Sequence, residues 1–279
     1  MYQHGLLVAG RHVRLRTDDP TIDRFLRRAC ARLDVPSATG TSPHDDASIA
    51  WNGTRAVVRF AGRPLPLEPA PHDALEVGMR GLALVFAEVF RRLQTVRALY
   101  AAGLSAGRTC VALVGPSGIG KTSLTLELLR RGWRTFGDEF LLLERRTLIA
   151  RAVPLAFAIR DAKRAQHDLD VGLLFGERCW ARPQRLTDVV FLERGMRSQL
   201  EALAPAHAAL RLLRFAFIDD VRSDDMWETV ALANRVRFHR LHMSGIAADA
   251  DTLHRTLSRA RPEVAGNRED VTWMSTQTA

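Results

Sequence analysis

The sequence is poor in cysteine, with three in 279 residues. Cys30, Cys110 and Cys179 lie far apart and show no Cys-x-x-Cys spacing, so neither a disulfide framework nor a zinc site is predicted. Long apolar runs are also missing: the most apolar stretch, 81–90, is followed at once by Arg91 and Arg92. The first residues show no charged region leading into an apolar core. We therefore expect no membrane span, no export signal and a location in the reducing cytoplasm.

No helix-turn-helix, zinc-finger or RNA-binding motif is present, so a nucleic-acid partner is not expected. The formal charge is nevertheless +9 and the pI is near 10.7. The arginines are spread along the chain, as in the pairs 91–92, 130–131 and 145–146, and do not form one basic block. Two interpretations stay open: arginine-rich solvated surfaces, or a positive field that attracts acidic or phosphorylated partners.

The pattern of apolar residues predicts four regions. Residues 1–70 should form a small α+β element, with a strand at 8–17, a helix at 21–33, and strands at 47–51 and 55–60 joined by a turn at Asn52-Gly53. Apolar residues recur every three or four positions after His72, which predicts one long connecting helix over 71–100. Short apolar runs at 140–143, 155–159, 189–192 and 236–243 predict a mixed α/β domain over 101–262. The polar tail 263–279 should be disordered.

The clearest motif is a phosphate-binding loop, Gly-x-x-x-x-Gly-Lys-Thr, between an apolar strand at 109–114 and an amphipathic segment at 123–131. Glycines let backbone N–H groups turn toward phosphate oxygens, and the following helix points its positive end at the same charge. Lys121 should reach the β- and γ-phosphates, and the Thr122 hydroxyl should bind Mg²⁺. The predicted nucleotide contacts are Gly115, Pro116, Ser117, Gly118, Ile119, Gly120, Lys121, Thr122 and Ser123.

A second acidic site must complete such a centre, and the sequence offers two candidates. Glu193 ends the apolar run 189–192, as the Mg²⁺-binding carboxylate does in many ATPases. Asp138 and Glu139 are adjacent and follow the loop helix closely. A pair of this kind favours a phosphotransferase in which one carboxylate binds metal and the other accepts the proton of an attacking hydroxyl.

Residues 115–139, with Arg131-Gly132-Trp133-Arg134 and Asp138-Glu139 at matching places, resemble the HPr serine kinase/phosphorylase family, and residues 186–193 are similar to a later strand of that family. The resemblance implies an α/β fold with a P-loop core like those of HPr kinase and phosphoenolpyruvate carboxykinase. It also implies ATP, Mg²⁺ and phosphoryl transfer to a serine hydroxyl. By the same resemblance, Asp138 is the proton acceptor and Glu139 a direct or water-mediated Mg²⁺ contact, although the two roles can be exchanged. Arg160 is a phosphate contact or a surface ion pair.

The chain departs from the family at three places. Tyr100 stands where the family has a histidine ahead of the loop, and the segment 158–161 keeps Arg160 but lacks the family glutamate. A Gly-Arg-Asn motif is missing near 244–246. These departures argue against the reverse, phosphate-removing reaction and against HPr as the substrate. The pattern resembles shortened HPr-kinase-like proteins, some of which occur in gene clusters for modified peptides such as lasso peptides.

We therefore expect a kinase that phosphorylates a Ser/Thr hydroxyl of a peptide or small protein. Family relatives assemble through their cores, so a homo-oligomer is an open possibility. Two alternatives remain. A transporter-type ATPase would require a Leu-Ser-Gly-Gly-Gln signature, which the sequence lacks. A nucleotide-binding regulator without catalysis would be consistent with Tyr100 and the missing Gly-Arg-Asn motif.

Overall fold

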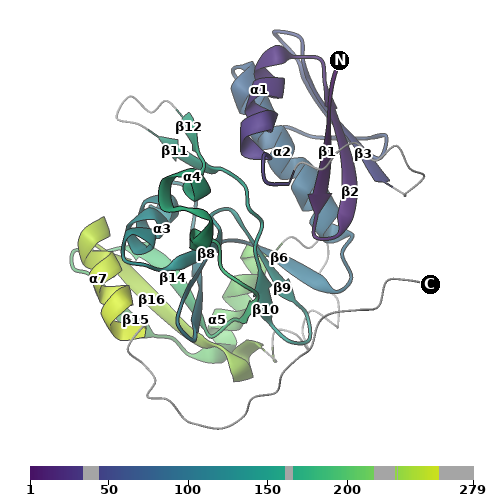
Figure 1. Ribbon diagram of the computed structural model, residues 1–279. Coiled ribbons are helices and arrows are strands. Elements are labelled where there is room, and N and C mark those ends of the chain that lie inside the picture. The colour runs from purple at the N-terminus through teal and green to yellow at the C-terminus, as the bar shows by residue number, and fades with distance from the viewer. Residues whose placement is uncertain (34–43, 161–165, 217–229, 231, 258–279) are drawn as a thin grey trace.

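The computed structural model describes residues 1–33, 44–160, 166–216, 230 and 232–257. These residues form an N-terminal unit and a larger α/β unit, at the upper right and lower left of Figure 1. No helix in the described ranges is long and apolar enough to cross a membrane. The predicted disordered tail, 263–279, lies outside the described residues.

The N-terminal unit is a five-stranded sheet of order β1-β2-β3-β4-β5. Only the β2–β3 pair is parallel. Its elements are β1 (Tyr2–Val8), β2 (Arg11–Thr17), α1 (Pro20–Ala29), β3 (His44–Trp51), β4 (Ala56–Phe60) and β5 (Arg63–Leu65). The hairpin predicted around Asn52 is confirmed, because β3 and β4 pair antiparallel on either side of it. The side-chain oxygen of Asn52 accepts hydrogen bonds from the backbone N–H groups of Thr54 and Arg55.

The strand predicted at 8–17 is confirmed over Arg11–Thr17, which is β2, but it does not extend back to Val8. The chain reverses at Ala9 and Gly10, both with positive φ (49° and 82°), and β1 pairs back onto β2. This is the geometry of a tight two-residue hairpin turn. The predicted helix at 21–33 is α1, which begins one residue earlier and ends at Ala29. Asp19 caps it by accepting hydrogen bonds from the N–H groups of Thr21 and Ile22.

The helix predicted over 71–100 is longer than the helix that forms. Helix α2 (Ala74–Arg91) begins where Asp73 accepts the Glu76 N–H at 2.8 Å and Glu76 accepts the His72 N–H at 2.8 Å. It ends at Arg91, and Val96–Ala106 is strand β6. Because β6 is buried on both faces, its apolar residues do not alternate with polar ones, and their spacing continues the helical pattern by coincidence.

The α/β unit is built on a nine-stranded sheet of order β13-β10-β9-β6-β7-β14-β16-β15, with β8 paired to β6. Strands β7, β14 and β16 are parallel at its centre. The strands are β6, β7 (Thr109–Val114), β8 (Arg134–Gly137), β9 (Phe140–Glu144), β10 (Ile149–Arg151), β13 (Gln184–Arg185), β14 (Asp188–Arg194), β15 (Gln199–Ala202) and β16 (Arg237–Met243). The apolar runs at 140–143, 189–192 and 236–243 are confirmed as strands of this sheet, namely β9, β14 and β16.

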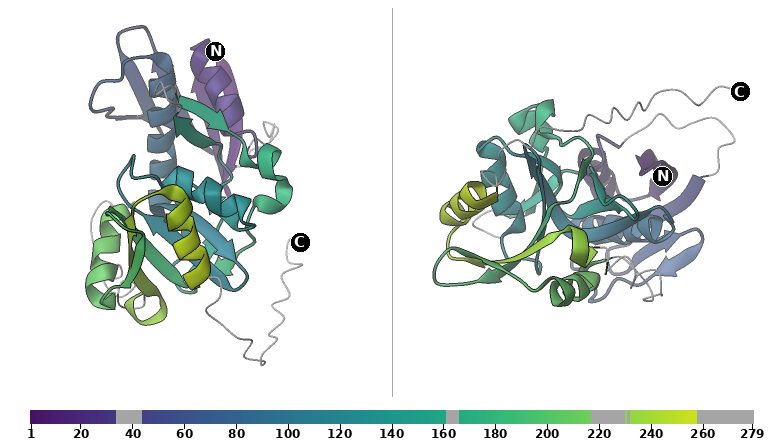
Figure 2. Two further views of the ribbon diagram at one scale, coloured as in Figure 1. Left: turned by 90° about the vertical axis from the view of Figure 1, so that its left-hand side faces the viewer. Right: turned by 90° about the horizontal axis from the view of Figure 1, so that it is seen from below.

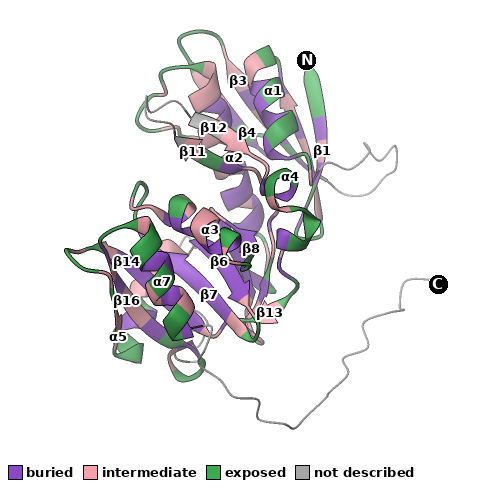
Figure 3. Cartoon of the chain, turned by 60° about the vertical axis from the view of Figure 1, so that its left-hand side comes forward, coloured by how far each residue is buried: buried purple, intermediate pink, exposed green. Residues whose placement is uncertain are grey.

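Helices cover both faces of this sheet, giving a three-layer α/β/α arrangement. On one face, α3 (Lys121–Arg130) and α7 (Ile246–Leu257) pack on Val111, Leu113, Val190 and Leu192. On the other, α5 (Pro205–Leu212), which continues into the short η2 (Leu213–Phe215), packs on Val189 and Phe191. Figure 3 shows the buried strands β6 and β7 behind the exposed outer faces of α3 and α7.

A small hairpin, β11 (Phe157–Arg160) with β12 (Gln166–Leu169), leads into α4 (Val171–Phe175) and η1 (Glu177–Cys179). The run predicted at 155–159 therefore forms a strand outside the main sheet. Arg32, three residues after α1 ends, contacts this region, with its guanidinium 3.0 Å from Asp170 and 2.7 Å from Glu177. The three cysteines are buried and are not joined in disulfides.

The two units share one apolar core. Helix α2 runs from the N-terminal sheet down to the α/β unit (Figure 2). Phe86 and Phe90 of α2 pack on Phe140, with ring centroids 5.9 and 5.2 Å apart. Val96, Ala98, Phe140 and Leu142 thus belong to the same cluster as the N-terminal sheet. The face of α2 beside these rings is held at a fixed place relative to the start of β9.

Candidate functional site

The predicted phosphate loop, Gly115–Thr122, connects the buried strand β7 to α3. Gly118 and Gly120 adopt positive φ of 77° and 112°, which side-chain-bearing residues rarely reach. No side chain caps α3 within the described residues. Its first N–H groups therefore stay available at the positive end of the helix, an arrangement that binds anions.

Lys121 is buried and curls over this loop. Its ammonium donates hydrogen bonds to the carbonyl oxygens of Gly115 at 2.8 Å and Pro116 at 3.1 Å, and lies 4.5 Å from the centre of the Tyr100 ring. Burial lowers the pKa of Lys121, and the charges of Asp138 and Glu139 partly oppose that shift. The ammonium is thus held by weak acceptors that a phosphate group would replace.

Asp138 faces the loop from the turn between β8 and β9. Its Oδ2 accepts a hydrogen bond of 2.5 Å from the Thr122 hydroxyl, whereas its Oδ1 is buried with no partner in the described protein. Burial raises the pKa of Asp138 to about 6, although the Thr122 hydrogen bond and the Lys121 charge act in the opposite direction. Asp138 and Thr122 therefore place three oxygen atoms close together beside Lys121.

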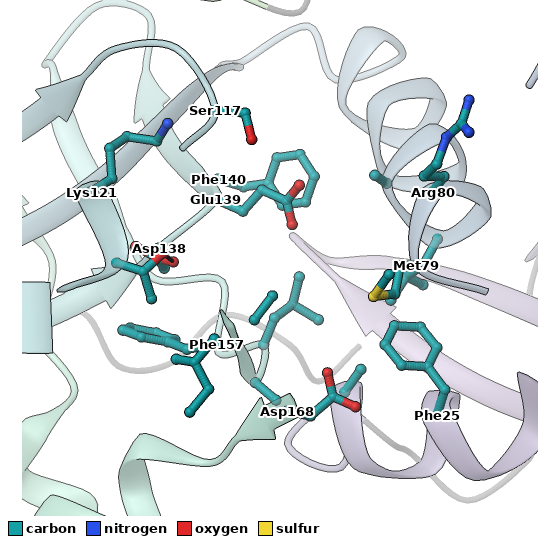
Figure 4. Close-up of a pocket in the computed structure, with 18 of the residues that line it drawn as sticks. Phe25, Met79, Arg80, Ser117, Lys121, Asp138, Glu139, Phe140, Phe157 and Asp168 are labelled. Carbon is teal, nitrogen blue, oxygen red and sulfur yellow. Dashed lines mark hydrogen bonds between the residues drawn. The ribbon is translucent and has the colours of Figure 1, made fainter. Parts of the chain in front are cut away.

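Glu139 points elsewhere. Its carboxylate reaches into the open space between the loop and α2 (Figure 4). Surrounding protein atoms displace much of its hydration, and this burial, together with the charge of Asp138, raises the pKa of Glu139 to about 7. The Lys121 charge opposes this rise in pKa, and Glu139 remains exposed to a molecule in the cleft.

Gly137 directs the two carboxylates to their places. It has a φ of 137°, and a Cβ there would lie 2.9 Å from the Val153 carbonyl oxygen. Only glycine fits this turn without a shift of the backbone. The next two residues are Asp138 and Glu139, after which Phe140 enters the core and fixes the end of the turn.

Lys121, Thr122, Asp138 and Glu139 line one cleft of about 1080 Å³. One side comes from Tyr100, the loop, α3 and the carboxylate turn, and the opposite side from α1 and α2. Of the predicted nucleotide contacts, Ser117, Gly118, Gly120, Lys121, Thr122 and Ser123 line the cleft, but Gly115, Pro116 and Ile119 do not. The roles of all these residues remain predictions.

The other predicted residues lie elsewhere. Glu193 forms ion pairs with Arg211 at 2.7 Å and Arg240 at 3.2 Å and does not line the cleft, so Asp138 and Glu139 are the candidate carboxylates. Arg160 ends β11, and its side chain lies outside the described residues. In the 131–134 turn, the buried Trp133 donates to His254 at 2.9 Å, which indicates a structural role.

Sequence reasoning missed the α1 and α2 side of the cleft, which includes Phe25, Leu75, Met79 and Arg80, as well as Asp168 of β12. No motif marks these residues, since tertiary packing alone brings them opposite the loop. The one available signal was the apolar stripe of α2, which the sequence predicted correctly as far as Arg91.

The donor set fits Mg²⁺ bound together with phosphate. The described residues contain no group of three or more His, Cys, Asp or Glu that would hold a metal ion by themselves. Mg²⁺ commonly takes one or two carboxylates and completes its shell with waters and substrate phosphates. The Thr122 hydroxyl and the unpartnered Asp138 oxygen meet that requirement.

No family model matches the sequence. No curated protein matches it either. Among solved structures, the chain is similar to the Hpr(Ser) kinase/phosphatase from Coxiella burnetii, with 17% identity and a TM-score of 0.37 over 57% of this chain and 93% of that one. The described residues have a mixed α/β architecture.

Proposed function

We propose that the protein transfers the γ-phosphoryl group of ATP, with Mg²⁺, to a Ser/Thr hydroxyl of a peptide or small protein. One observation carries this proposal: two adjacent carboxylates line the cleft beside the predicted phosphate loop, but only Asp138 bonds to the loop. Asp138 accepts the Thr122 hydrogen bond, and Glu139 points into the open cleft. A nucleotide-binding protein without an acceptor substrate has no need of the second group.

The nucleotide phosphates would lie on the loop. The N–H groups at the start of α3 would bind phosphate oxygens, and Lys121 would exchange its two carbonyl acceptors for the β- and γ-phosphates. The Thr122 hydroxyl and Asp138 would hold Mg²⁺, which neutralises phosphate charge when bound. Phosphoryl transfer depends mainly on such positioning and electrostatic stabilisation.

This arrangement exchanges the roles that the family resemblance implied for the two carboxylates. Asp138 is engaged with Thr122 and belongs to the metal side. Glu139 is open to the cleft and has a pKa of about 7, which suits a general base at neutral pH. In the proposed reaction, the acceptor hydroxyl gives its proton to Glu139, its oxygen bonds to the γ-phosphorus, and the bond from that phosphorus to the bridging oxygen of ADP breaks.

The proposal is tested by incubating the protein with γ-labelled ATP, Mg²⁺ and the peptides or small proteins encoded beside its gene. We expect label on serine or threonine. Glu139→Gln should lower the transfer rate by about 10² to 10⁴ while ATP still binds. Glu193→Gln is the matched control, because it makes the same change outside the cleft.

Lys121→Ala should weaken ATP binding and transfer together, since it removes the phosphate contact. If that variant bound ATP as well as the wild type, the assignment of the loop would be wrong. If the wild type bound ATP and transferred no label to any protein or peptide, the regulator alternative would replace the kinase.

A further inference from the structure

The side of the cleft opposite the loop is apolar. Helix α2 contributes Leu75, Met79 and Ala83, α1 contributes Phe25, and the segment before β11 contributes Leu155. We call these five residues the acceptor wall. Four of them are only half-buried although they pack against the core, so part of their apolar surface faces the cleft. Apolar surface that stays exposed inside a cleft is typical of a binding site.

We propose that the acceptor wall binds a peptide segment that carries a bulky apolar side chain next to the hydroxyl to be phosphorylated. This inference rests on the proposed function and adds the substrate class. Its geometric basis is that Glu139 lies between the loop and the wall (Figure 4). A molecule on the wall therefore meets the candidate base directly.

The direction of the reaction separates the acceptor from the nucleoside. Lys121 and Thr122 mark where the terminal phosphates and Mg²⁺ would lie. The attacking and leaving oxygens of phosphoryl transfer stand roughly in line on opposite sides of phosphorus. The nucleoside must therefore extend away from the carboxylates, and the space beyond Glu139 is left for the acceptor.

The wall is rigidly tied to Glu139. Phe140, the next residue, packs its ring against Phe86 and Phe90 of α2, so Met79 and Ala83 on the same helix keep a fixed distance from the carboxylate. A preorganised spacing of this kind selects an acceptor in which the apolar side chain and the hydroxyl stand at one separation.

The backbone at the cleft favours a peptide over a small alcohol. Strand β11 pairs only with β12 among the described residues, so its other edge has no strand partner there. Residues 155–159, which include most of β11, line the cleft. An unpaired edge can bind an extended peptide through main-chain hydrogen bonds while a neighbouring pocket receives a side chain.

The charges agree with an apolar contact. Arg80 also lines the cleft, but its guanidinium is paired with Glu76 at 3.0 Å, and Asp73 caps α2. Arg80 is thus paired with Glu76, and Asp73 is engaged by the helix, so the α2 side presents mainly apolar area to the cleft. The cleft volume of about 1080 Å³ is at the upper end for small-molecule sites, which leaves room for a triphosphate and an acceptor side chain.

The test uses short peptide pools with a central serine and one fixed neighbour, either Leu, Met, Phe or Asp, and measures label transferred from γ-labelled ATP. We expect the apolar pools to be labelled at least about tenfold more than the Asp pool. Met79→Asp should abolish that preference by raising the KM for peptide. Met196→Asp makes the same change at a methionine that is almost fully exposed outside the cleft and should have no effect.

Two binding measurements interpret the variant. ATP and inorganic tripolyphosphate should bind Met79→Asp as they bind the wild type, which also shows that the variant is folded. If the variant lost affinity for ATP but not for tripolyphosphate, the wall would hold the nucleobase and the proposal would be overturned. Equal labelling of all pools would also overturn it.

Peptide binding separates this inference from the proposed function. A fluorescein-labelled Leu pool is titrated with the protein and a non-hydrolysable ATP analogue, and polarisation is recorded. Binding that depends on Met79, without transfer to any pool, would uphold the wall and refute the kinase. Transfer to a protein substrate with no Met79-dependent binding or rate would uphold the kinase and refute the wall.

Discussion

Replacing Asp138 by asparagine should stabilise the nucleotide-free protein at alkaline pH. The pKa of Asp138 is raised to about 6 in the folded protein, so the native state holds a proton there at pH values where the unfolded chain has lost it. A group of this kind stabilises the fold below its unfolded pKa, near 3.9, and that contribution is lost as pH rises toward 6. Asparagine stays neutral throughout and still offers Thr122 an oxygen acceptor.

The magnitude follows from the shift in pKa. A change from 3.8 to about 6 corresponds to about 3 kcal/mol at ~1.4 kcal/mol for each pKa unit. Because Asp138 is half-buried, solvent screening reduces the effect, and we expect Asp138→Asn to gain about 1–2 kcal/mol at pH 8. Removing the Asp138 charge also removes its repulsion of the ionised Glu139, and this adds to the gain in stability at pH 8.

The assay is urea unfolding at pH 4 and pH 8 without nucleotide or Mg²⁺. Asp188→Asn is the matched control with the opposite sign. Burial alone would raise the pKa of Asp188, but hydrogen bonds from His239, Arg237 and Thr187 outweigh it and lower the pKa. That variant should lose stability at pH 8. The reasoning would be refuted if Asp138→Asn were no more stable than the wild type at pH 8, or kept the wild-type difference between the two pH values.

Three further predictions concern neighbouring groups. Tyr100→Phe should keep ATP affinity and Tyr100→Leu should weaken it about three- to tenfold by calorimetry, because the ring lies over the Lys121 ammonium; equal loss in both variants would exclude the ring. Binding of ATP with Mg²⁺ should tighten as pH rises through about 6, because Asp138 must lose its proton to hold Mg²⁺; equilibrium dialysis showing no pH dependence would contradict this. Arg32→Ala should raise amide exchange at the end of α1, because two ion pairs tie it to Asp170 and Glu177; unchanged exchange would show that the apolar core alone holds the two units together.

The sequence predicted the parts of the site that lie close together along the chain. The loop, Thr122 and the pair Asp138-Glu139 all fall within 115–139, and glycine and charge patterns mark them directly. It left the roles of the two carboxylates open. Their difference depends on side-chain direction, which the positive φ of Gly137 and the burial of Phe140 set in three dimensions.

Two kinds of error in the fold have a common cause. The helix predicted to Tyr100 rested on apolar residues that recur every three or four positions, and the strand predicted at 8–17 rested on alternating apolar and polar residues. Strand β6 is buried on both faces, and the β1–β2 hairpin reverses within two residues, so neither shows a period that separates it from its neighbour. Met79 and Phe25 of the acceptor wall lie on the apolar faces of α2 and α1, so no pattern in the sequence distinguishes them from core positions.

Among the described residues, the two carboxylates of raised pKa, Asp138 and Glu139, are neighbours in the cleft, and this supports the site independently of any motif. Elsewhere, buried carboxylates are paired: Asp45 lies between Arg11 and Arg92, and Asp188 binds Arg237 and His239. In the cleft, Asp138 keeps an oxygen without a partner, and Glu139 has a pKa far above its ordinary value. A bound cation would relieve both, because it would take the unpartnered Asp138 oxygen as a ligand and favour the ionised form of both carboxylates. A chain that pairs its buried carboxylates elsewhere but leaves Asp138 with an unpartnered oxygen here is organised to bind a ligand in this cleft.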